Sequence, residues 1–265
     1  EVTYIDVTER GVIDPEQLKN AIRNDTVAIS VMYVNNETGV VQPIDEIAKM
    51  IEGKGIVLHT DAIQGVGKEM ILPKKQGIHA LSAAAHKFYG PKGTGFLYLD
   101  QNYMIEKEIT GGSQERNRRS GTENVHGIVG MAKALEIVYS DMEEEQAKEK
   151  EMQIYLEEAL KKEICNIKIN CGNSRRISSV VNITLEDCNV QTLMVALDME
   201  GICVSGGSAC MSGAMETSHV LKAMGASEED LKSSIRVSIG RYNTKDEIDI
   251  FIQKLKEIVA RERAK

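Results

Sequence analysis

The sequence predicts an α/β protein with a mostly parallel sheet flanked by helices, followed by a smaller α+β domain. Two observations lead to this class. In the first half, β-branched and apolar runs alternate with segments of helical periodicity, as in sheets whose strands are joined by helices. In the second half, a long helical stretch precedes another set of short strands and helices. A length of 265 residues suffices for one large domain or two moderate ones.

The predicted strands of the first half cover residues 26–34, 55–60, 79–84 and 95–99. The first is a near-continuous apolar run, which is typical of a strand buried on both faces. A helix is predicted from Pro43, because proline suits a first turn, to a glycine at 53 or 55. Ligands of open α/β sheets bind beyond the carboxyl ends of the strands. The polar residues that follow these strands are Asn36, Asp61, Gln64, His86 and Lys87.

Residues 124–162 have helical periodicity almost throughout, with a mixed charge run at 143–151 that predicts a solvated helix face or a connector. Beyond it the sequence predicts strands at 180–185 and 235–239, and helices at 191–199, at 218–224 and from Lys245 onward. We expect a domain boundary near residue 143. The larger domain would then comprise residues 1–143 and the smaller one residues 144–265.

Composition excludes several classes of function. With 32 Lys and Arg against 40 Asp and Glu, the net charge is −8, which argues against nucleic acid as a partner. No apolar run is long enough for a membrane span, and the first residues do not resemble a signal peptide. Five scattered cysteines form no C-x-x-C pair, so we expect no metal site and a reduced, cytoplasmic compartment.

Asp61 and Lys87 each stand at the end of a predicted strand. A carboxylate beside a buried strand is costly unless a cation pairs with it. A lysine at such an edge is either an ion-pair partner or an amine able to form a Schiff base. Pyridoxal phosphate uses both groups, because its aldehyde bonds a lysine and its ring nitrogen needs a carboxylate partner. The alternative is a plain salt bridge between the two side chains.

Cys210 lies in a segment of small residues, 205–213, with the sequence SGGSACMSG. Small residues on both sides of a cysteine predict a turned, exposed loop. An exposed thiol can act as a nucleophile, whereas Cys188 and Cys203 border apolar runs and are expected to be less accessible. The alternative is an incidental surface thiol.

Two further segments offer groups that bind anions. Arg236 alternates with Ile235 and Val237 in a predicted strand, so its guanidinium could clamp a carboxylate; the alternative is a salt bridge at the strand edge. Residues 111–122 combine glycines, hydroxyls and arginines before a helix, which can hold a phosphate through backbone N–H groups. The nucleotide-binding patterns GxxxxGK[ST] and GxGxxG do not occur.

Six motifs occur in an order that carries a family resemblance: VNNETG at 34–39, HTDAIQ at 59–64, AHKFYGPKG at 85–93, RSGT at 119–122, SAC at 208–210 and SIR at 234–236. The chain resembles the pyridoxal phosphate-dependent cysteine desulfurases of the NifS/IscS type, within the fold-type I aminotransferase superfamily. The cysteine motif is similar to that of the long-loop branch, rather than the short-loop SufS or selenocysteine lyase branch. Roughly the first third of the family's chain has no counterpart here, so we expect this sequence to be part of a longer chain.

The resemblance implies roles for the cofactor-binding residues. Lys87 would bond the cofactor's aldehyde and later remove the substrate's α-proton, and Asp61 would hold the ring nitrogen protonated. Gln64 and Asn36 would hydrogen-bond the region of the phenolic oxygen, and His86 would contact the phosphate and belong with the catalytic residues. Thr122 would reach the phosphate of a neighbouring subunit's cofactor, which implies a homodimer.

The resemblance also implies the reaction. Arg236, with Asn36, would bind the substrate, L-cysteine, through its α-carboxylate. Cys210 would attack the substrate sulfur, leaving L-alanine and a Cys210 persulfide for a sulfur-acceptor or scaffold protein in iron–sulfur cluster assembly or thiolation. The alternatives are a selenocysteine or cystine lyase-like class V enzyme, and a degenerate homologue that acts as a binding or regulatory protein.

One position departs from the family pattern. The family commonly has a phosphate-binding serine three residues before the lysine, and this sequence has Ala84 there. Ser82 lies two residues earlier and, by strand alternation, on the same side. The loss of one neutral hydrogen bond to phosphate is expected to weaken cofactor binding by about 1–3 kcal/mol.

Overall fold

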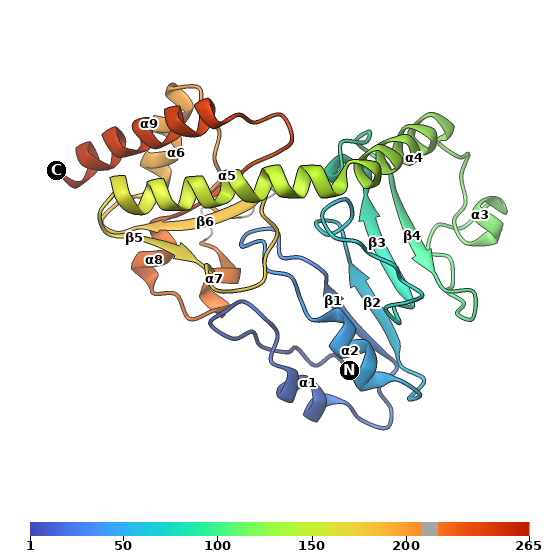
Figure 1. Ribbon diagram of the computed structural model, residues 1–265. Coiled ribbons are helices and arrows are strands. Elements are labelled where there is room, and N and C mark those ends of the chain that lie inside the picture. Colours follow the sequence, from blue (N-terminus) through green and yellow to red (C-terminus); the bar gives the residue numbers. More distant parts are fainter. Residues whose placement is uncertain (208–216, 265) are drawn as a thin grey trace. The chain divides into compact units, whose positions relative to one another are not determined.

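The computed structural model describes residues 1–207 and 217–264, and the chain divides into two compact units (Figure 1). Unit 1 consists of Glu1–Ala21, Val34–Gln42 and Glu143–Lys265. Unit 2 consists of Ile22–Tyr33 and Pro43–Met142. Two short stretches of the N-terminal half therefore belong to the same unit as the C-terminal half.

Unit 2 is built on a four-stranded sheet in the order β1-β2-β3-β4. The first three strands pair in parallel and the last pairs antiparallel to its neighbour. The carboxyl ends of the three parallel strands therefore lie at one edge of the sheet. The strands are β1 (Ala28–Met32), β2 (Val57–Asp61), β3 (Ala80–Ala84) and β4 (Gly95–Leu99).

The other elements of unit 2 follow from local signals. Helix α2 (Ile44–Ile51) buries three isoleucines at helical spacing, Ile44, Ile47 and Ile51, as its periodicity predicts. A single 3-10 turn, η1 (Ala85–Lys87), follows β3 directly. The short α3 (Gln114–Asn117) precedes α4 (Val125–Ser140), whose first turn is capped by the Asn124 side chain.

The prediction that the first strand is buried on both faces is wrong. In β1 the side chains of Ala28, Ser30 and Met32 are exposed, and that of Ile29 is buried. Alternate residues of a strand point to opposite faces, so only one face of β1 is covered by other described residues. A continuous apolar run does not distinguish a strand covered on one face from one covered on both.

Unit 1 contains a three-stranded antiparallel sheet in the order β5-β6-β7. Its strands are β5 (Ile167–Asn170), β6 (Val180–Leu185) and β7 (Ser234–Ser238). Its helices are α1 (Pro15–Ala21), α5 (Met142–Glu163), α6 (Val190–Met199), α7 (His219–Ala223), α8 (Glu228–Lys232) and α9 (Lys245–Arg263). Helix α9 begins with a complete capping box formed by Thr244 and Glu247.

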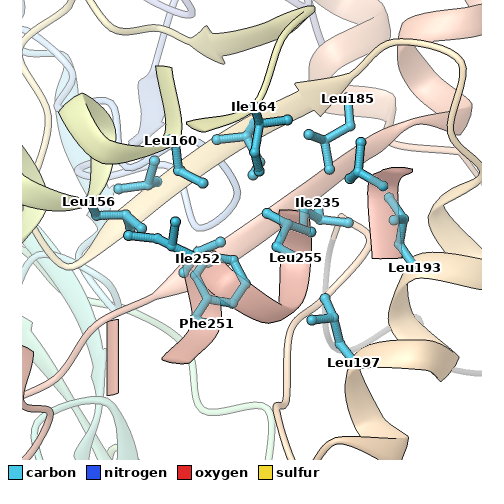
Figure 2. Close-up of a cluster of buried hydrophobic side chains, with 14 of the residues drawn as sticks. Leu156, Leu160, Ile164, Leu185, Leu193, Leu197, Ile235, Phe251, Ile252 and Leu255 are labelled. Atoms are coloured by element: carbon cyan, nitrogen blue, oxygen red, sulfur yellow. The ribbon is translucent and has the colours of Figure 1, made fainter. Parts of the chain in front are cut away.

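The core of unit 1 brings together side chains from α5, α6, α9 and two strands of the small sheet (Figure 2). The side chains of Leu156 and Leu160 from α5, Leu197 from α6 and Leu255 from α9 are fully buried. This core arises because each helix presents one apolar face at a spacing of three to four residues. The core of unit 1 therefore fixes the strand that carries Arg236.

One row of polar side chains crosses the small sheet while buried. Asn170 Nδ2 donates to Asn182 Oδ1 at 2.7 Å and to Thr184 Oγ1 at 2.8 Å. The Thr184 and Ser234 hydroxyls are hydrogen-bonded at 2.8 Å. All four side chains are buried, so each depends on these partners in place of water.

The predicted fold class is confirmed: one part has a mostly parallel sheet with helices, and the other has a small sheet with helices. The elements without a sequence prediction are α1, η1, α3, β5 and α8, each of seven residues or fewer. Among the helices of the described residues, none is both long and apolar enough to cross a membrane.

Candidate active site

Asp61 is the last residue of β2 and lies at the carboxyl edge of the parallel strands. It pairs in register with Met32 of β1 and Ser82 of β3. Its Oδ1 accepts a hydrogen bond from the Ile63 backbone N–H at 3.0 Å, which holds the carboxylate over the following turn. Gln64 is half-buried in that same turn. The carboxylate itself is exposed, contrary to the expectation that it would need a cation for burial.

Lys87 and His86 lie in the 3-10 turn that follows β3, the strand next to β2. Both side chains are exposed, whereas the neighbouring Phe88 is 1% exposed and anchors the turn. Gly90 closes it, because a Cβ there would lie 2.9 Å from the Ala85 Cβ. The close packing of this turn holds the lysine backbone in one conformation at the sheet edge.

The alternative of a plain salt bridge between Asp61 and Lys87 is not realised. Within residues 1–207 and 217–264, no ion pair joins them, and the Lys87 amine has no hydrogen-bond partner. An exposed primary amine and an exposed carboxylate thus follow neighbouring parallel strands. Both remain available to a ligand.

A chain of hydrogen bonds runs across three strands two residues before this edge. The Ser30 hydroxyl is 2.8 Å from His59 Nδ1, and His59 Nε2 is 2.8 Å from the Ser82 hydroxyl. Ser82 is therefore engaged with His59. Its hydroxyl does not stand in for the serine that the family pattern has at position 84.

In unit 1, Asn36 and Arg236 are brought together from positions 200 residues apart. Arg236 Nη1 donates to the Asn36 backbone oxygen at 3.0 Å. As its alternation predicts, the arginine is half-buried while Ile235 and Val237 are buried. The guanidinium is thereby held beside the turn that carries Asn36.

Thr122 is exposed and lies just before α4. In the glycine- and arginine-rich segment before it, the Ser120 hydroxyl donates to the Gly112 oxygen at 2.6 Å. At the start of α4, the Asn124 side chain accepts from the Gly127 N–H at 3.1 Å. The Ser120 hydroxyl and the Gly127 N–H are thus already used, whereas the Thr122 hydroxyl, which the family resemblance assigns to a phosphate, is exposed.

Cys210 lies outside the described residues. The four described cysteines are all free thiols. Burial raises the pKa of the Cys171 and Cys188 thiols, so neither is predisposed to act as a thiolate nucleophile. Cys203 is exposed, which corrects the expectation drawn from its apolar neighbours.

The donor set at the sheet edge fits pyridoxal phosphate. The aldehyde requires a primary amine, and no other described residue engages the Lys87 amine. The ring N–H requires an acceptor, and within the described residues the Asp61 carboxylate accepts a hydrogen bond only from the Ile63 N–H. Ala84 supplies no hydrogen bond through its side chain, so any support for the phosphate comes from other residues. Within the described residues, no cluster of three or more His, Cys, Asp or Glu side chains could hold a metal ion.

Sequence reasoning assigned no role to Glu37, Ser218 or His59. Glu37 is 1% exposed and its Oε2 accepts a hydrogen bond from the Ser218 hydroxyl at 2.5 Å. The available signal was an acidic residue between the apolar residues 31–34 and 40–41, where burial would require a partner. The partner itself lies 181 positions away and could not be identified from the sequence.

Comparison with known proteins extends over nearly the whole chain. The family model described as aminotransferase class-V matches residues 1–251. A cysteine desulfurase IscS of Dictyoglomus turgidum is 40% identical over 263 residues, covering 99% of this chain and 67% of that protein. A cysteine desulfurase IscS of Methanosarcina thermophila is 42% identical over 263 residues, covering 99% of this chain and 65% of that protein. The chain thus spans about two thirds of the length of these relatives.

Solved structures of NifS-like proteins are also similar to this chain over nearly its whole length. A NifS-like protein superimposes with a TM-score of 0.90 at 34% identity, covering 98% of this chain and 68% of that one. A NifS-like protein from Rickettsia africae superimposes with a TM-score of 0.89 at 35% identity, covering 97% of this chain and 69% of that one. The fold is therefore that of the fold-type I enzymes, as the sequence motifs predict.

Proposed function

Because the chain belongs to the class-V aminotransferase family, whose members use pyridoxal phosphate, we propose that it acts as a cysteine desulfurase. The proposal depends on one observation: the exposed Lys87 amine, which pairs with no other described residue, and the exposed Asp61 carboxylate lie at the ends of neighbouring parallel strands. The substrate is L-cysteine, and the products are L-alanine and sulfur held as a persulfide on Cys210.

The cofactor, when bound, supplies an electron sink next to the substrate's α-carbon. Lys87 holds its aldehyde carbon, Asp61 accepts a hydrogen bond from the ring nitrogen, and Gln64 and Asn36 bind near the phenolic oxygen. His86 and Thr122 bind the phosphate, with Thr122 reaching the group held by a second subunit. An exposed Thr122 hydroxyl supports that role.

The chemical steps use three residues of this chain. Arg236 binds the α-carboxylate of L-cysteine with its guanidinium, which its bond to the Asn36 carbonyl holds in place. The Lys87 amine, once the amino group of the substrate has taken its place and set it free, takes the proton from the α-carbon. The Cys210 thiolate attacks the substrate sulfur, so that a carbon–sulfur bond breaks, a sulfur–sulfur bond forms, and a proton is delivered to the β-carbon. L-cysteine and one thiol become L-alanine and one persulfide.

The persulfide then passes to a sulfur-acceptor or scaffold protein, for iron–sulfur cluster assembly or thiolation. We assign the reaction to the cytoplasm. The four described cysteines are free thiols, which suits a reducing compartment.

We infer that the enzyme is a homodimer. On α4, directly after Thr122, Val125, Ile128 and Val129 lie on one side of the helix with 60%, 38% and 62% of their surfaces exposed. Exposed apolar side chains grouped in this way are typical of protein interfaces. A second copy seated on this stripe would lie close to Thr122, which stands three residues before Val125.

The test of the function has two parts. The visible absorption spectrum after addition of pyridoxal phosphate is expected to show a band in the parent chain that is absent in Lys87→Ala. Incubation with L-cysteine is then expected to release alanine, and Lys87→Ala to lower the rate by about 10²–10⁴-fold.

Cys210→Ala distinguishes the two enzyme alternatives. A desulfurase loses nearly all turnover on L-cysteine, whereas a lyase that acts without a persulfide retains much of its rate. Absence of both the absorption band and alanine release in the parent chain would contradict the enzymatic proposal and favour a binding or regulatory role.

A further inference from the structure

Glu37 is a buried acidic residue that has no part in the proposed reaction. Only 1% of its surface is exposed. Burial of an ionised carboxylate costs several kcal/mol unless hydrogen bonds compensate for the lost water. The hydrogen-bond partners of the Glu37 carboxylate therefore indicate its structural role.

The backbone around Glu37 is fixed on both sides. The Asn35 side-chain oxygen accepts from the N–H groups of Glu37 and Thr38 at 2.9 and 3.0 Å, forming a tight turn. The Asn182 amide of β6 donates to the Glu37 backbone oxygen at 3.2 Å. The turn is thus attached to the small sheet, and the direction of the glutamate side chain is set.

One carboxylate oxygen of Glu37 is hydrogen-bonded at one point of the chain and lies close to a second point. The Ser218 hydroxyl donates to Glu37 Oε2 at 2.5 Å. Gly207 lies beside the same oxygen, because a Cβ at this glycine would be 3.5 Å from Oε2 and 3.7 Å from the Ser218 Cβ. The chain therefore passes Glu37 once just before residues 208–216 and once just after them.

Both of these points are also connected to other elements. Before the first, Ser205 exchanges two backbone hydrogen bonds with Arg236, at 3.2 and 2.6 Å. At the second, the Ser218 hydroxyl accepts from the Leu221 N–H at 3.0 Å and so caps α7. Residue 207 follows the pairing of Ser205 with the strand of Arg236, and Ser218 begins α7. Glu37 lies beside both residues and so links the strand to the helix.

We propose that Glu37 is a positioning residue that holds together the two ends of the segment carrying Cys210. Its carboxylate offsets part of the entropy lost in joining the ends. The first end is also paired with Arg236 through Ser205. The catalytic consequence rests on the proposed function: the described residues on either side of 208–216 stay tied to the unit that carries the arginine that binds the substrate carboxylate.

The first experiment needs neither cofactor nor turnover. Hydrogen–deuterium exchange of the cofactor-free chain is measured by mass spectrometry in peptides covering residues 203–207 and 217–221. In Glu37→Ala, exchange is expected to rise on the order of tenfold in both peptides, since the hydrogen bond from Ser218 and the packing beside Gly207 are lost together. In Glu37→Gln the rise is smaller, because the amide oxygen still accepts the Ser218 proton. Glu149→Gln, which alters another buried carboxylate of the same unit, is the control.

The second experiment measures alanine formation from L-cysteine in the cofactor-loaded chain. Ser218→Ala is expected to lower kcat by tenfold or more with little change in KM, since misplacement of a reacting group slows the chemical step. Ser227→Ala is the matched control: Ser227 caps α8 through the Asp230 N–H, as Ser218 caps α7, but it makes no bond to Glu37. This variant should retain the parental kcat.

The outcomes separate the two proposals. Unchanged exchange at both ends in Glu37→Ala overturns the positioning role, whatever the activity. Raised exchange with a parental kcat in Ser218→Ala overturns it as well. If the parent chain releases no alanine, the desulfurase proposal fails, and the exchange data alone decide whether Glu37 joins the two ends. If Glu37→Ala does not fold, Ser218→Ala and Glu37→Gln provide the same comparison.

Discussion

At the scale of single residues, the site combines groups that are exposed with groups that hold them. Lys87 and Asp61 are exposed, whereas Phe88 next to the lysine is buried and fixes its backbone. Arg236 is half-buried against a backbone carbonyl. Buried neighbouring side chains hold the backbone in place. The reactive side chains at the sheet edge can therefore contact a ligand.

Ala84 offers a test at this scale. Ala84→Ser restores a hydroxyl three residues before the lysine, where the family pattern has one, and Ala84 is only half-buried, which leaves room for it. We expect pyridoxal phosphate to bind about five- to 150-fold more tightly, which corresponds to the 1–3 kcal/mol expected for this one hydrogen bond. Titration of the visible absorption band gives the Kd. Ala28→Ser, at an exposed position of β1, should leave the Kd unchanged; an unchanged Kd in Ala84→Ser itself would mean that position 84 does not face the phosphate.

Some of these residues could be predicted from the sequence and others could not. Asp61 and Lys87 follow recognisable strands, and the order of strands in a parallel sheet brings such ends to one edge. The contact of Glu37 with Ser218 depends on two turns that meet only after the small sheet has formed. A contact between residues 181 positions apart leaves no periodic pattern in the sequence.

At the scale of elements, the core of unit 1 depends on a few fully buried leucines. Leu197 of α6 is 0% exposed and packs in the core shown in Figure 2. Leu197→Ala is expected to lower the free energy of unfolding by about 2–5 kcal/mol, as lost burial and a cavity combine. Denaturant unfolding measures the change. Val195→Ala, on the same helix but 63% exposed, should change stability far less; equal losses in the two variants would contradict this core.

Helix α9 carries two ion pairs that predict a pH dependence. Lys256 bonds Glu163 at 2.7 Å and Lys254 bonds Glu200 at 2.8 Å. These lysine hydrogen bonds hold the pKa of both carboxyls below the ordinary value. The unfolded chain therefore binds more protons at acidic pH, so the contribution is present above a pH of about 4.3 and is lost as pH falls through the lowered pKa values.

The effect is small because the pairs lie at the surface. The double variant Glu163→Gln with Glu200→Gln should be slightly less stable than the parent at neutral pH, by urea unfolding. The difference should vanish toward acidic pH, where the parent carboxyls are protonated too. If the difference in stability persisted at acidic pH, it would come from altered packing and not from the lost charges.

The elements themselves differed in how well the sequence predicted them. Strands and helices with several apolar residues in period were located to within a few positions, as for α2 and β4. Shorter elements such as α1 and α8 have only one buried residue each, Leu18 and Leu231, and give no periodic signal. The exposed face of β1 was missed because an apolar run does not reveal which face is covered.

At the scale of the whole molecule, the apolar stripe of α4 predicts self-association. Val129→Glu places a charge on the stripe and is expected to convert a dimer to a monomer in sedimentation velocity, since a buried unpaired charge opposes association. Val195→Glu, at a valine of nearly equal exposure on α6, is the control and should remain dimeric. A parent chain that sediments as a monomer at high concentration would contradict the homodimer.

The buried polar row across β5, β6 and β7 has a consequence for how the chain folds. Leucines in place of Asn170, Asn182, Thr184 and Ser234 would bury as well and would pair in any register. The amides and hydroxyls find their partners in only one alignment, and a slip by one residue would strand them without water. The buried polar row therefore specifies the register of the small sheet. Mispaired strands are disfavoured by the desolvation cost of the unpaired polar groups, and Arg236 reaches its place only in the correct alignment.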